Sequence, residues 1–586
     1  MSSAFGLNNI PVGLAKRVEV YKGVVPIELG GDALGGAINI VTDNSRCTRV
    51  NASYSFGSFN THKTNVYAEH TTKKGFYVSL NAYQNYSDND YKVNIDSYTK
   101  FNEDGSNQEV KENLTVRRFH AKYHNEVAIL KIGIVDKTFA DRLLLGFMGG
   151  YEYKQTQNAS TMDWVYGARY TTANTLMPQL TYEKRFKVLK GLHVSLNGIY
   201  NWLGQSQPKG VPGELSYMKY RYRDHNGAAN FRMALFPADG QSVSLSSTLT
   251  TFSRSGKDET AYKPTYEHPS QSMKIVTGLS YKYDYKGKWN TSAFVKHYMN
   301  HLEAYLDPEG GINYQDFSNT TSYWGGGWAS TYFWGRHTQL RLSYEYALRL
   351  PTSRELFGSG DDIERGNSNL KPESSNNVNI SVTANAVDLT DHRLTIDAAF
   401  QYREIKDYIR RTTNNDSGRA SSQNDGRVRN LGTDLSIRYT FKDAFFVGGN
   451  FSYIDMRSLT RYVTGTQQES KNYTERVPAI PYMYGNGEAG LTLRDVFVKG
   501  TVLDIHYMMN YVQKFSYEWN VYQNAELDIP TQFSHDLFVS YNFGKKSEFT
   551  VSAECTNIFN ARLYDNFKMQ KPGRAFAIKF GYSFMK

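Results

Sequence analysis

The feature that most constrains this chain is a two-residue alternation of side-chain character that recurs from about residue 50 to the C-terminus. In 192–202, apolar residues occupy nearly every second position, and polar or small residues occupy the positions between them. The segments 394–403 and 576–584 repeat the pattern. A period of two places apolar side chains on one face of a β-strand and polar side chains on the other. The pattern therefore predicts an all-β chain.

The size and composition of the chain decide which all-β architecture can hold such strands. Its 586 residues exceed the size of about 250–300 residues at which a single hydrophobic core stops growing, yet its hydrophobic content is only 40%. No run of about 18 apolar residues is present, which excludes transmembrane helices. Two cysteines are too few for a disulfide scaffold or a multi-cysteine metal cluster. A transmembrane barrel needs no large core, because its apolar faces meet lipid and its polar faces line the interior.

The connections between the predicted strands indicate the size of the barrel. Ten short polar turns alternate with eleven mostly longer connections, which predicts a 22-stranded antiparallel transmembrane β-barrel. Short periplasmic turns and long extracellular loops are typical of outer-membrane barrels. We place the short turns at 73–75, near Asn125, and at 187–191, 237–240, 286–288, 335–336, 390–391, 442–443, 494–495 and 544–546, and long connections at 87–115, 139–174, 204–224, 350–375, 409–428, 458–478 and 511–530.

Residues 1–45 differ in kind from the rest of the chain. They hold no long alternating strand, but they contain Gly23 and glycine pairs at 30–31 and 35–36. Glycines at this density are typical of a compact, turn-rich unit with close backbone contacts. We therefore expect a unit of residues 1–45, separate from a barrel of residues 46–586.

Several motifs resemble those of one family, the TonB-dependent outer-membrane receptors. The segments 16–23 (KRVEVYKG) and 35–42 (GGAINIVT) are similar to the last third of the family's plug domain. The segments 350–358 (LPTSRELFG) and 366–374 (GNSNLKPES) are similar to two barrel motifs at the family's usual interval, and 557–560 (NIFN), Tyr564 and 572–574 (PGR) to the region before its closing strand. The motifs occur in one order across the whole chain, so their combination is highly specific.

The resemblance implies that residues 1–45 are the C-terminal part of a plug domain, and that the chain lacks the signal peptide, the TonB box and most of the plug. It also implies that Arg17 and Glu19 form ion pairs between the plug and the barrel. The plug segment has Val24-Val25-Pro26 where the family often has a Gly-Pro step, so its detailed geometry can differ. Phe580, Tyr582 and Phe584 of the last strand are the residues that the barrel-assembly machinery would recognise, although two residues follow Phe584. A monomer in outer-membrane lipid is expected.

Charge is the feature that points to a ligand. The net charge is +10, and arginines are interleaved with aromatic residues in the predicted extracellular connections. Such residues suit an anionic aromatic ligand through charge-assisted hydrogen bonds and cation–π contacts. Nucleic acid is not expected, because no compact binding module is present. The candidate ligand-binding residues are Arg142, Tyr151, Tyr153, Trp164, Arg221, Arg223, Arg354, Arg410 and Arg411, with Arg169, Tyr170, Tyr220, Tyr222, Arg419, Arg427 and Arg429 among the further members of the set.

The resemblance implies active transport, in which TonB with ExbB and ExbD uses the proton-motive force to move the plug. The preferred ligand is an anionic iron–siderophore chelate, and no resident cofactor is expected. Haem receptors of the family commonly carry a histidine between the two barrel motifs, and the interval from Leu350 to Leu370 holds none. Haem and cobalamin remain alternatives, and the sequence leaves open a Ca²⁺ requirement and an accessory surface lipoprotein.

Two other classes of function, a pore or adhesin and an enzyme, are alternatives to transport. A passive outer-membrane pore or adhesin would need only the barrel. An enzyme is not expected, because the pairs Asp224-His225, Asp391-His392 and His535-Asp536 are adjacent residues that point to opposite faces of a strand. A metal site is not expected either, because neither Cys47 nor Cys555 has a partner at ligand spacing.

Overall fold

The strands close into one barrel. The computed structural model describes residues 15–42, 47–96, 98–102, 104–110, 112–157, 162, 169–186, 191–209, 218–258, 270–306, 315–358, 364–413, 420–462, 467–519, 528–545, 547–566 and 569–586. Within them, 22 antiparallel strands form a closed barrel in which the last strand pairs with the first. The prediction of a 22-stranded all-β barrel is confirmed. The strands are β3 (Arg49–Gly57), β4 (Thr61–Thr71), β5 (Phe76–Ser87), β10 (Tyr123–Val135), β11 (Arg142–Gln155), β12 (Tyr170–Arg185), β13 (His193–Lys209), β14 (Met218–Leu235), β15 (Gln241–Asp258), β16 (Ser270–Tyr285), β17 (Trp289–Leu306), β18 (Gln315–Trp334), β19 (Thr338–Arg349), β21 (Glu373–Asp388), β22 (His392–Lys406), β25 (Val428–Phe441), β26 (Phe445–Ser458), β27 (Met483–Arg494), β28 (Val502–Val512), β31 (Gln532–Phe543), β32 (Ser547–Thr556) and β35 (Ala575–Met585).

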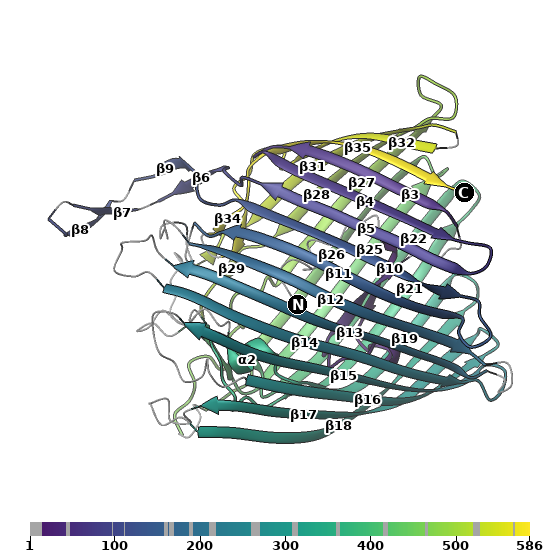
Figure 1. Ribbon diagram of the computed structural model, residues 1–586, viewed down its shortest axis with the longest axis horizontal. Helices are drawn as coiled ribbons and strands as arrows, with labels where there is room; N and C mark the ends of the chain where they lie inside the picture. Colours follow the sequence, from purple (N-terminus) through teal and green to yellow (C-terminus); the bar gives the residue numbers. More distant parts are fainter. Residues whose placement is uncertain are drawn as a thin grey trace.

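Short connections gather at one end of the barrel and mostly long connections at the other, on the right and left of Figure 1. Two predicted connections were wrong. Asn125 lies inside β10 and is fully buried, and the short turn is at 136–141, so β11 occupies much of the predicted loop 139–174. The turn contains no glycine and uses Asp136 at a positive φ of 57°, while three glycines within β11 weakened its alternation.

The two faces of the wall follow the alternation of the sequence. Directly paired residues share a face, so the outward face can be traced from strand to strand. Large apolar side chains such as Phe147, Leu176 and Phe580 are exposed on the outer face, where lipid would cover them. Polar residues such as Asn81 and Ser246 lie buried on the inner face. No described helix is both long and apolar enough to cross a membrane.

A small sheet made from the N-terminal residues lies inside the barrel, drawn in purple in Figure 1. It consists of β1 (Ala15–Lys22) and β2 (Gly36–Thr42), which are antiparallel, and a 3-10 turn, η4 (Ile27–Leu29), lies between them. Gly30 ends this turn with a φ of 65°, and a Cβ there would lie 2.3 Å from the Oγ1 atom of Thr248 on β15. Glycine is therefore required by both the backbone conformation and the close approach to the wall.

The long connections carry small elements of their own. The helix α2 (Ser353–Phe357) follows β19, and a three-stranded sheet joins β20 (Glu364–Arg365), β24 (Ala420–Asn424) and β23 (Ile409–Thr413). An arm between β5 and β10 projects from the left of Figure 1. The remaining pairs are β6 (Lys92–Ile95) with β9 (Leu114–Arg117), β7 (Tyr98–Phe101) with β8 (Asn107–Val110), β29 (Phe515–Ser516) with β30 (Asp528–Ile529), and β33 (Tyr564–Asn566) with β34 (Met569–Gln570).

Candidate functional site

The N-terminal sheet is held to the barrel wall by two acidic residues. Glu28 of η4 has a side chain only 8% exposed, and it pairs with Lys282 of β16 at 2.6 Å and with Arg232 of β14 at 3.7 Å. Burial raises the pKa of the Glu28 carboxyl, but the charge and hydrogen bond of Lys282 outweigh burial and hold the pKa below its ordinary value of 4.5. The carboxylate therefore stays ionised against the wall.

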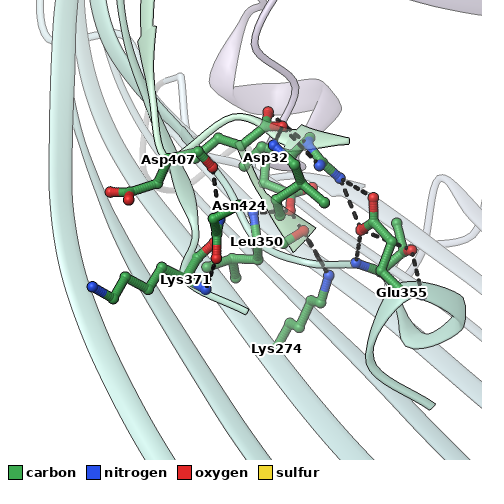
Figure 2. A network of polar contacts seen from close by, with 11 residues as sticks. Asp32, Lys274, Leu350, Glu355, Lys371, Asp407 and Asn424 are labelled. Carbon is green, nitrogen blue, oxygen red and sulfur yellow. Dashed lines mark hydrogen bonds and ion pairs between the residues drawn. The ribbon is translucent and has the colours of Figure 1, made fainter. Parts of the chain in front are cut away.

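Asp32, the second acid, contacts the barrel where β19 ends. Its Oδ2 atom accepts a hydrogen bond of 2.8 Å from the backbone N–H of Leu350 and lies 3.9 Å from the Nζ atom of Lys274. Lys274 also donates a hydrogen bond of 3.2 Å to the carbonyl oxygen of Leu350. Figure 2 shows these three residues together beside α2. Both the backbone N–H and the backbone carbonyl of Leu350 are thus hydrogen-bonded to charged side chains.

Arg349 ties this position to α2 and to β21. Its guanidinium donates to both oxygens of Glu373, at 2.8 and 3.0 Å, and to both oxygens of Glu355, at 3.1 and 3.0 Å. Glu355 also completes a capping box with Thr352 at the start of α2, which satisfies N–H groups that a helix start leaves free. These bonds fix the helix on the barrel.

The same network reaches a second long connection. The carboxylate of Glu373 accepts a hydrogen bond of 2.6 Å from the backbone N–H of Ile409. Asn424 accepts from the N–H of Lys371 at 2.9 Å and donates to the carbonyl of Asp407 at 2.7 Å, as Figure 2 shows. The described parts of the connections, 350–358 with 364–372 and 407–413 with 420–427, are therefore joined into one platform, which contacts the N-terminal sheet through Asp32.

This platform brings three of the predicted ligand-binding residues together. Arg354 of α2 and Arg411 of β23 both approach the same carboxylate oxygen of Glu364, at 2.7 and 3.7 Å. The side chains of the two arginines are 64% and 56% exposed, whereas that of Glu364 is 5% exposed. Arg410 pairs with Asp425 at 2.5 Å, and its guanidinium lies 5.4 Å from the ring centre of Trp519. Two exposed guanidinium groups thus share one buried carboxylate, which leaves positive charge at the surface.

Other predicted ligand-binding residues lie away from this cluster. Arg142 is the first residue of β11 and lies at the end with the short turns, so its expected place in an extracellular connection was wrong. The reason is the misplaced turn, since the chain reverses at 136–141. The side chains of Trp164 and Arg221, like those of Arg419, Tyr220 and Tyr222, lie outside the residues that the structure describes.

Tyr151, Tyr153 and Arg223 occupy the outer face. Tyr151 packs 6.3 Å from His124, and Tyr153 packs 5.5 Å from Tyr170, both between ring centres. The intervening residue of β11 is Glu152, which is buried on the inner face. The two tyrosines are therefore part of an outward aromatic belt, where rings typically meet lipid headgroups. Arg223 is exposed and shares the outer face with Trp202, as the register of β13 and β14 requires.

Arg17 and Glu19 were expected to pair with the barrel, but in the structure they pair with each other. The Nη2 atom of Arg17 lies 2.6 Å from Glu19, and Glu19 accepts further hydrogen bonds from Asn39 and Tyr21. The hydrogen bond from Asn39, followed by that from Arg17, lowers the pKa of Glu19. Residues at positions 17 and 19 of a strand face the same side, so the two charges meet each other within the N-terminal sheet.

The acids that contact the barrel, Glu28 and Asp32, were missed by sequence reasoning. A usable signal was available on the wall, where Lys274 and Lys282 fall at inward positions of a strand otherwise lined by small and polar residues. Cations on the inner face of a barrel imply acidic partners inside it. Glu364 is a further acid whose partners only the structure shows, since two arginines approach its carboxylate.

The closing strand agrees with its expected geometry. Phe580 and the two aromatic residues at 582 and 584 alternate on one face of β35 and pair with Tyr54, Ala52 and Val50 of β3. Phe580 is 57% exposed on the outer face. These residues therefore lie at the seam where the barrel closes.

Among the residues that the structure describes, those with catalytic or metal-binding chemistry are not assembled into such sites. Asp224 is bound by both ends of the Arg254 guanidinium at 2.7 Å, while its neighbour His225 faces outward. The sequence also holds a His-x-x-x-His run at His297–His301, but both residues lie on β17, where a four-residue separation is about 13 Å. Among the described residues, no group of three or more histidine, cysteine or acidic side chains could hold a metal ion.

Comparison with solved structures finds the same architecture. The FrpB iron transporter from Neisseria meningitidis (F3-3 variant) is 15% identical, with a TM-score of 0.71 over 98% of this chain and 88% of that chain. The copper transporter OprC is 13% identical, with a TM-score of 0.72 over 97% and 86%. The ferric yersiniabactin uptake receptor FyuA from Yersinia pestis is 14% identical, with a TM-score of 0.67 over 97% and 85%. At these identities the likeness concerns the fold.

Comparison with curated proteins found no match. A family model described as "TonB dependent receptor-like, beta-barrel", however, matches residues 136–558. This range covers well over half of the chain and includes the strands that carry the platform and the arginine cluster. The family and the similar structures are receptors and transporters, not enzymes. The chain therefore belongs to the TonB-dependent receptor family, whose barrels lie in the bacterial outer membrane.

Proposed function

We propose that this protein imports an anionic iron–siderophore chelate across the outer membrane. The observation that carries the proposal is the pair of exposed guanidinium groups, Arg354 and Arg411, which share one buried carboxylate of Glu364. Guanidinium groups bind carboxylate and catecholate-type oxygens through paired charge-assisted hydrogen bonds. Both guanidinium groups face solvent, so a ligand anion can bind them while the buried Glu364 remains their partner.

A second contact favours an aromatic anion. Arg410 lies against Trp519, and the indole Nε1 of Trp519 is buried with no hydrogen-bond partner among the described residues. A buried donor without a partner costs free energy that a ligand oxygen would recover. Arginine and tryptophan in this arrangement suit a ligand that is both aromatic and negatively charged.

Energy for import would come from TonB with ExbB and ExbD acting on the plug, to which we assign residues 1–45, with residues 46–586 as the barrel. Glu28 and Asp32 hold this part to the wall through charged contacts. Such contacts can be broken and hydrated without exposing an apolar core. In this proposal the barrel acts as a monomer, and the outward aromatic residues of β35 are read by the barrel-assembly machinery.

Uptake of radiolabelled iron tests the proposal. Iron-starved cells with and without the gene would receive iron on separate siderophores, iron as haem, and radiolabelled cobalamin. We expect loss of uptake for one anionic siderophore, and the same loss when the proton-motive force is collapsed. Equal uptake of every iron source in both strains would overturn the siderophore assignment.

Controls in the same cells separate the remaining readings. The titles of similar structures name iron, ferric yersiniabactin and copper, so a radiolabelled copper arm distinguishes a copper carrier. Uptake that persists without the proton-motive force would indicate a passive pore. Uptake of a siderophore, uptake of copper and uptake without the proton-motive force therefore indicate an iron–siderophore importer, a copper carrier and a passive pore, respectively.

A further inference from the structure

The wall of the barrel has a step beside β18. Strand β18 pairs with β17 along its whole length, from Tyr332 opposite Trp289 to Gln315 opposite Leu306. On its other side it pairs with β19 only from Trp334 to Gly326. The segment 315–325 therefore has no neighbouring strand on the β19 side among the described residues. One edge of a β-strand is left open there.

The step arises because β19 separates from β18 after Tyr346, while it stays paired with β21 up to Arg349. Leu348 and Leu350 turn into a buried cluster with Val276 and Tyr298, and α2 follows inside the barrel. The departure coincides with the glycines at 325–327 of β18. A Cβ at Gly325 would lie 2.6 Å from the carbonyl oxygen of Tyr346. The glycines thus allow β19 to approach closely and then diverge.

The open edge lies beyond the membrane. Trp324 and Trp334 are 64% and 75% exposed on the outer face of β18, as expected for the two aromatic girdles of a barrel. Ten residues at about 3.4 Å each, tilted by about 40°, span roughly 25 Å, which matches the apolar band of such barrels. Residues 315–323 therefore project past the outer girdle, at the end with the long connections.

The projecting segment is ordered and lacks the usual protection of an edge. Phe317, on its inner face, packs against the buried cluster that contains Leu302 and Leu356. Edge strands are commonly protected by lysine, proline or a bulge, and 315–324 contains no lysine or proline and pairs with β17 without a register shift. Seven of these ten residues are exposed. The backbone groups on the open side are therefore held ready for a partner strand.

We propose that this edge of β18 binds an extended segment of a partner protein at the cell surface, by addition of a strand beyond the point where β19 separates from β18. An open edge presents alternating N–H and carbonyl groups that another β-strand matches. The outward charges of the projecting part of β17 and β18 are Glu303 and Asp316, without a lysine or arginine among the described residues. The partner segment therefore carries a basic side chain opposite Asp316.

A second copy of this chain in the same membrane cannot supply that strand. Antiparallel pairing of identical strands uses a two-fold axis perpendicular to the sheet, and this axis would turn the second barrel upside down. A two-fold axis along the membrane normal instead makes strands tilted by about 35–45° cross at twice that angle. The partner is thus a different polypeptide.

Site-specific photo-crosslinking in intact cells tests the proposal. A benzophenone amino acid would replace Ser318, on the open edge, or Ser253, which faces outward on β15 but has a strand on both sides. We expect a polypeptide adduct at position 318, mapped by mass spectrometry to an extended segment with a basic residue, and at least tenfold less at position 253. Equal adducts at both positions, adducts with lipid alone, or no polypeptide adduct would overturn the proposal.

Two proline variants provide a matched control. The N–H groups of adjacent strand residues point to opposite edges. Of the two variants Thr320→Pro and Thr321→Pro, one therefore removes a hydrogen bond to β17, and the other removes an N–H group on the open edge. The variant that keeps the thermal stability of the barrel is the open-edge variant, and it should lose the adduct about tenfold. Asp316→Lys should reduce the adduct severalfold by charge repulsion. An adduct that persists in the stable proline variant would refute strand addition.

Discussion

Charged residues have different roles in two places, which we call the floor and the top. The floor is where Glu28 and Asp32 contact the barrel, and the top is where Arg354 and Arg411 meet Glu364. At the floor, Glu28 and Asp32 are buried or half-buried and contact the wall that surrounds them. At the top, Arg354 and Arg411 are more than half exposed and share one acid. Buried charges are costly to unpair, whereas exposed pairs are worth little. The difference indicates that the floor holds the assembly together, whereas the arginines of the top face solvent, where a ligand anion can reach them.

The largest effect should follow from Arg349→Ala, which removes the link between floor and top. The substitution leaves the carboxylates of Glu355 and Glu373 without their common partner, and breaking such a pair costs about 3–5 kcal/mol. We expect a lower thermal unfolding temperature of the purified protein and loss of uptake. Arg349→Lys is the control, because it keeps one charge but not the bonds to both acids. Unchanged stability in the alanine variant would contradict the role of the platform.

Glu28→Ala should have the next largest effect, and it should act on the floor alone. Lys282 and Arg232 lose their buried partner, at a cost of about 1–3 kcal/mol. We expect greater sensitivity of cells to large antibiotics that the outer membrane normally excludes. Glu126→Ala on the outer face, whose carboxylate pairs only with a histidine in the described structure, should leave sensitivity unchanged.

Acid should weaken the same contact. The folded pKa of Glu28 lies below its ordinary value of 4.5, so the stabilisation is present above pH 4.5 and is lost as pH falls through the lower folded pKa. We expect the N-terminal sheet of the purified protein to become sensitive to an acid-active protease below about pH 4.5. The Glu28→Gln variant should show the same protease sensitivity above and below pH 4.5, since its side chain has no proton to gain.

At the top of the platform, the double substitution Arg354→Ala with Arg411→Ala should separate binding from stability. The unfolding free energy should fall by at most about 1–3 kcal/mol, because the two guanidinium groups are exposed but the carboxylate that they share is buried. Uptake at limiting ligand should fall about tenfold if two charge-assisted contacts are lost. The double lysine variant should recover part of the uptake. A large loss of stability with unchanged uptake would reverse the contrast between floor and top.

Glu364→Gln should produce the smallest effect, in the opposite direction. Glutamine at this buried position keeps an oxygen that can accept a hydrogen bond from the arginines but removes the charge that competes with a ligand anion, a change of about 0.5–1.5 kcal/mol. We expect the half-saturating ligand concentration for uptake to fall about threefold. Weaker binding would indicate that Glu364 positions the arginines rather than competing with the ligand.

Local sequence was sufficient for the wall and insufficient for the site. The outward positions of Phe580 and Leu394 followed from their alternation, because neighbouring side chains of any strand point to opposite faces. Tyr151 was expected in an extracellular connection, whereas it lies within β11, because the preceding turn falls earlier in the chain than predicted. That turn, at 136–141, has no glycine to mark it. An error in one turn therefore moved both Arg142 and Tyr151.

The sequence alone determined the 22-stranded barrel, its two faces and its family, because these depend on a short-range period and on contiguous motifs. Only the tertiary structure decided which charges meet. Asp32 contacts Leu350 across 318 positions of the chain, and Arg354 meets Arg411 at Glu364 because two separate connections fold onto each other. The early separation of β19 from β18 was likewise invisible in the sequence. Side-chain alternation records which way each residue points, but the partner it meets depends on the closure of the whole barrel.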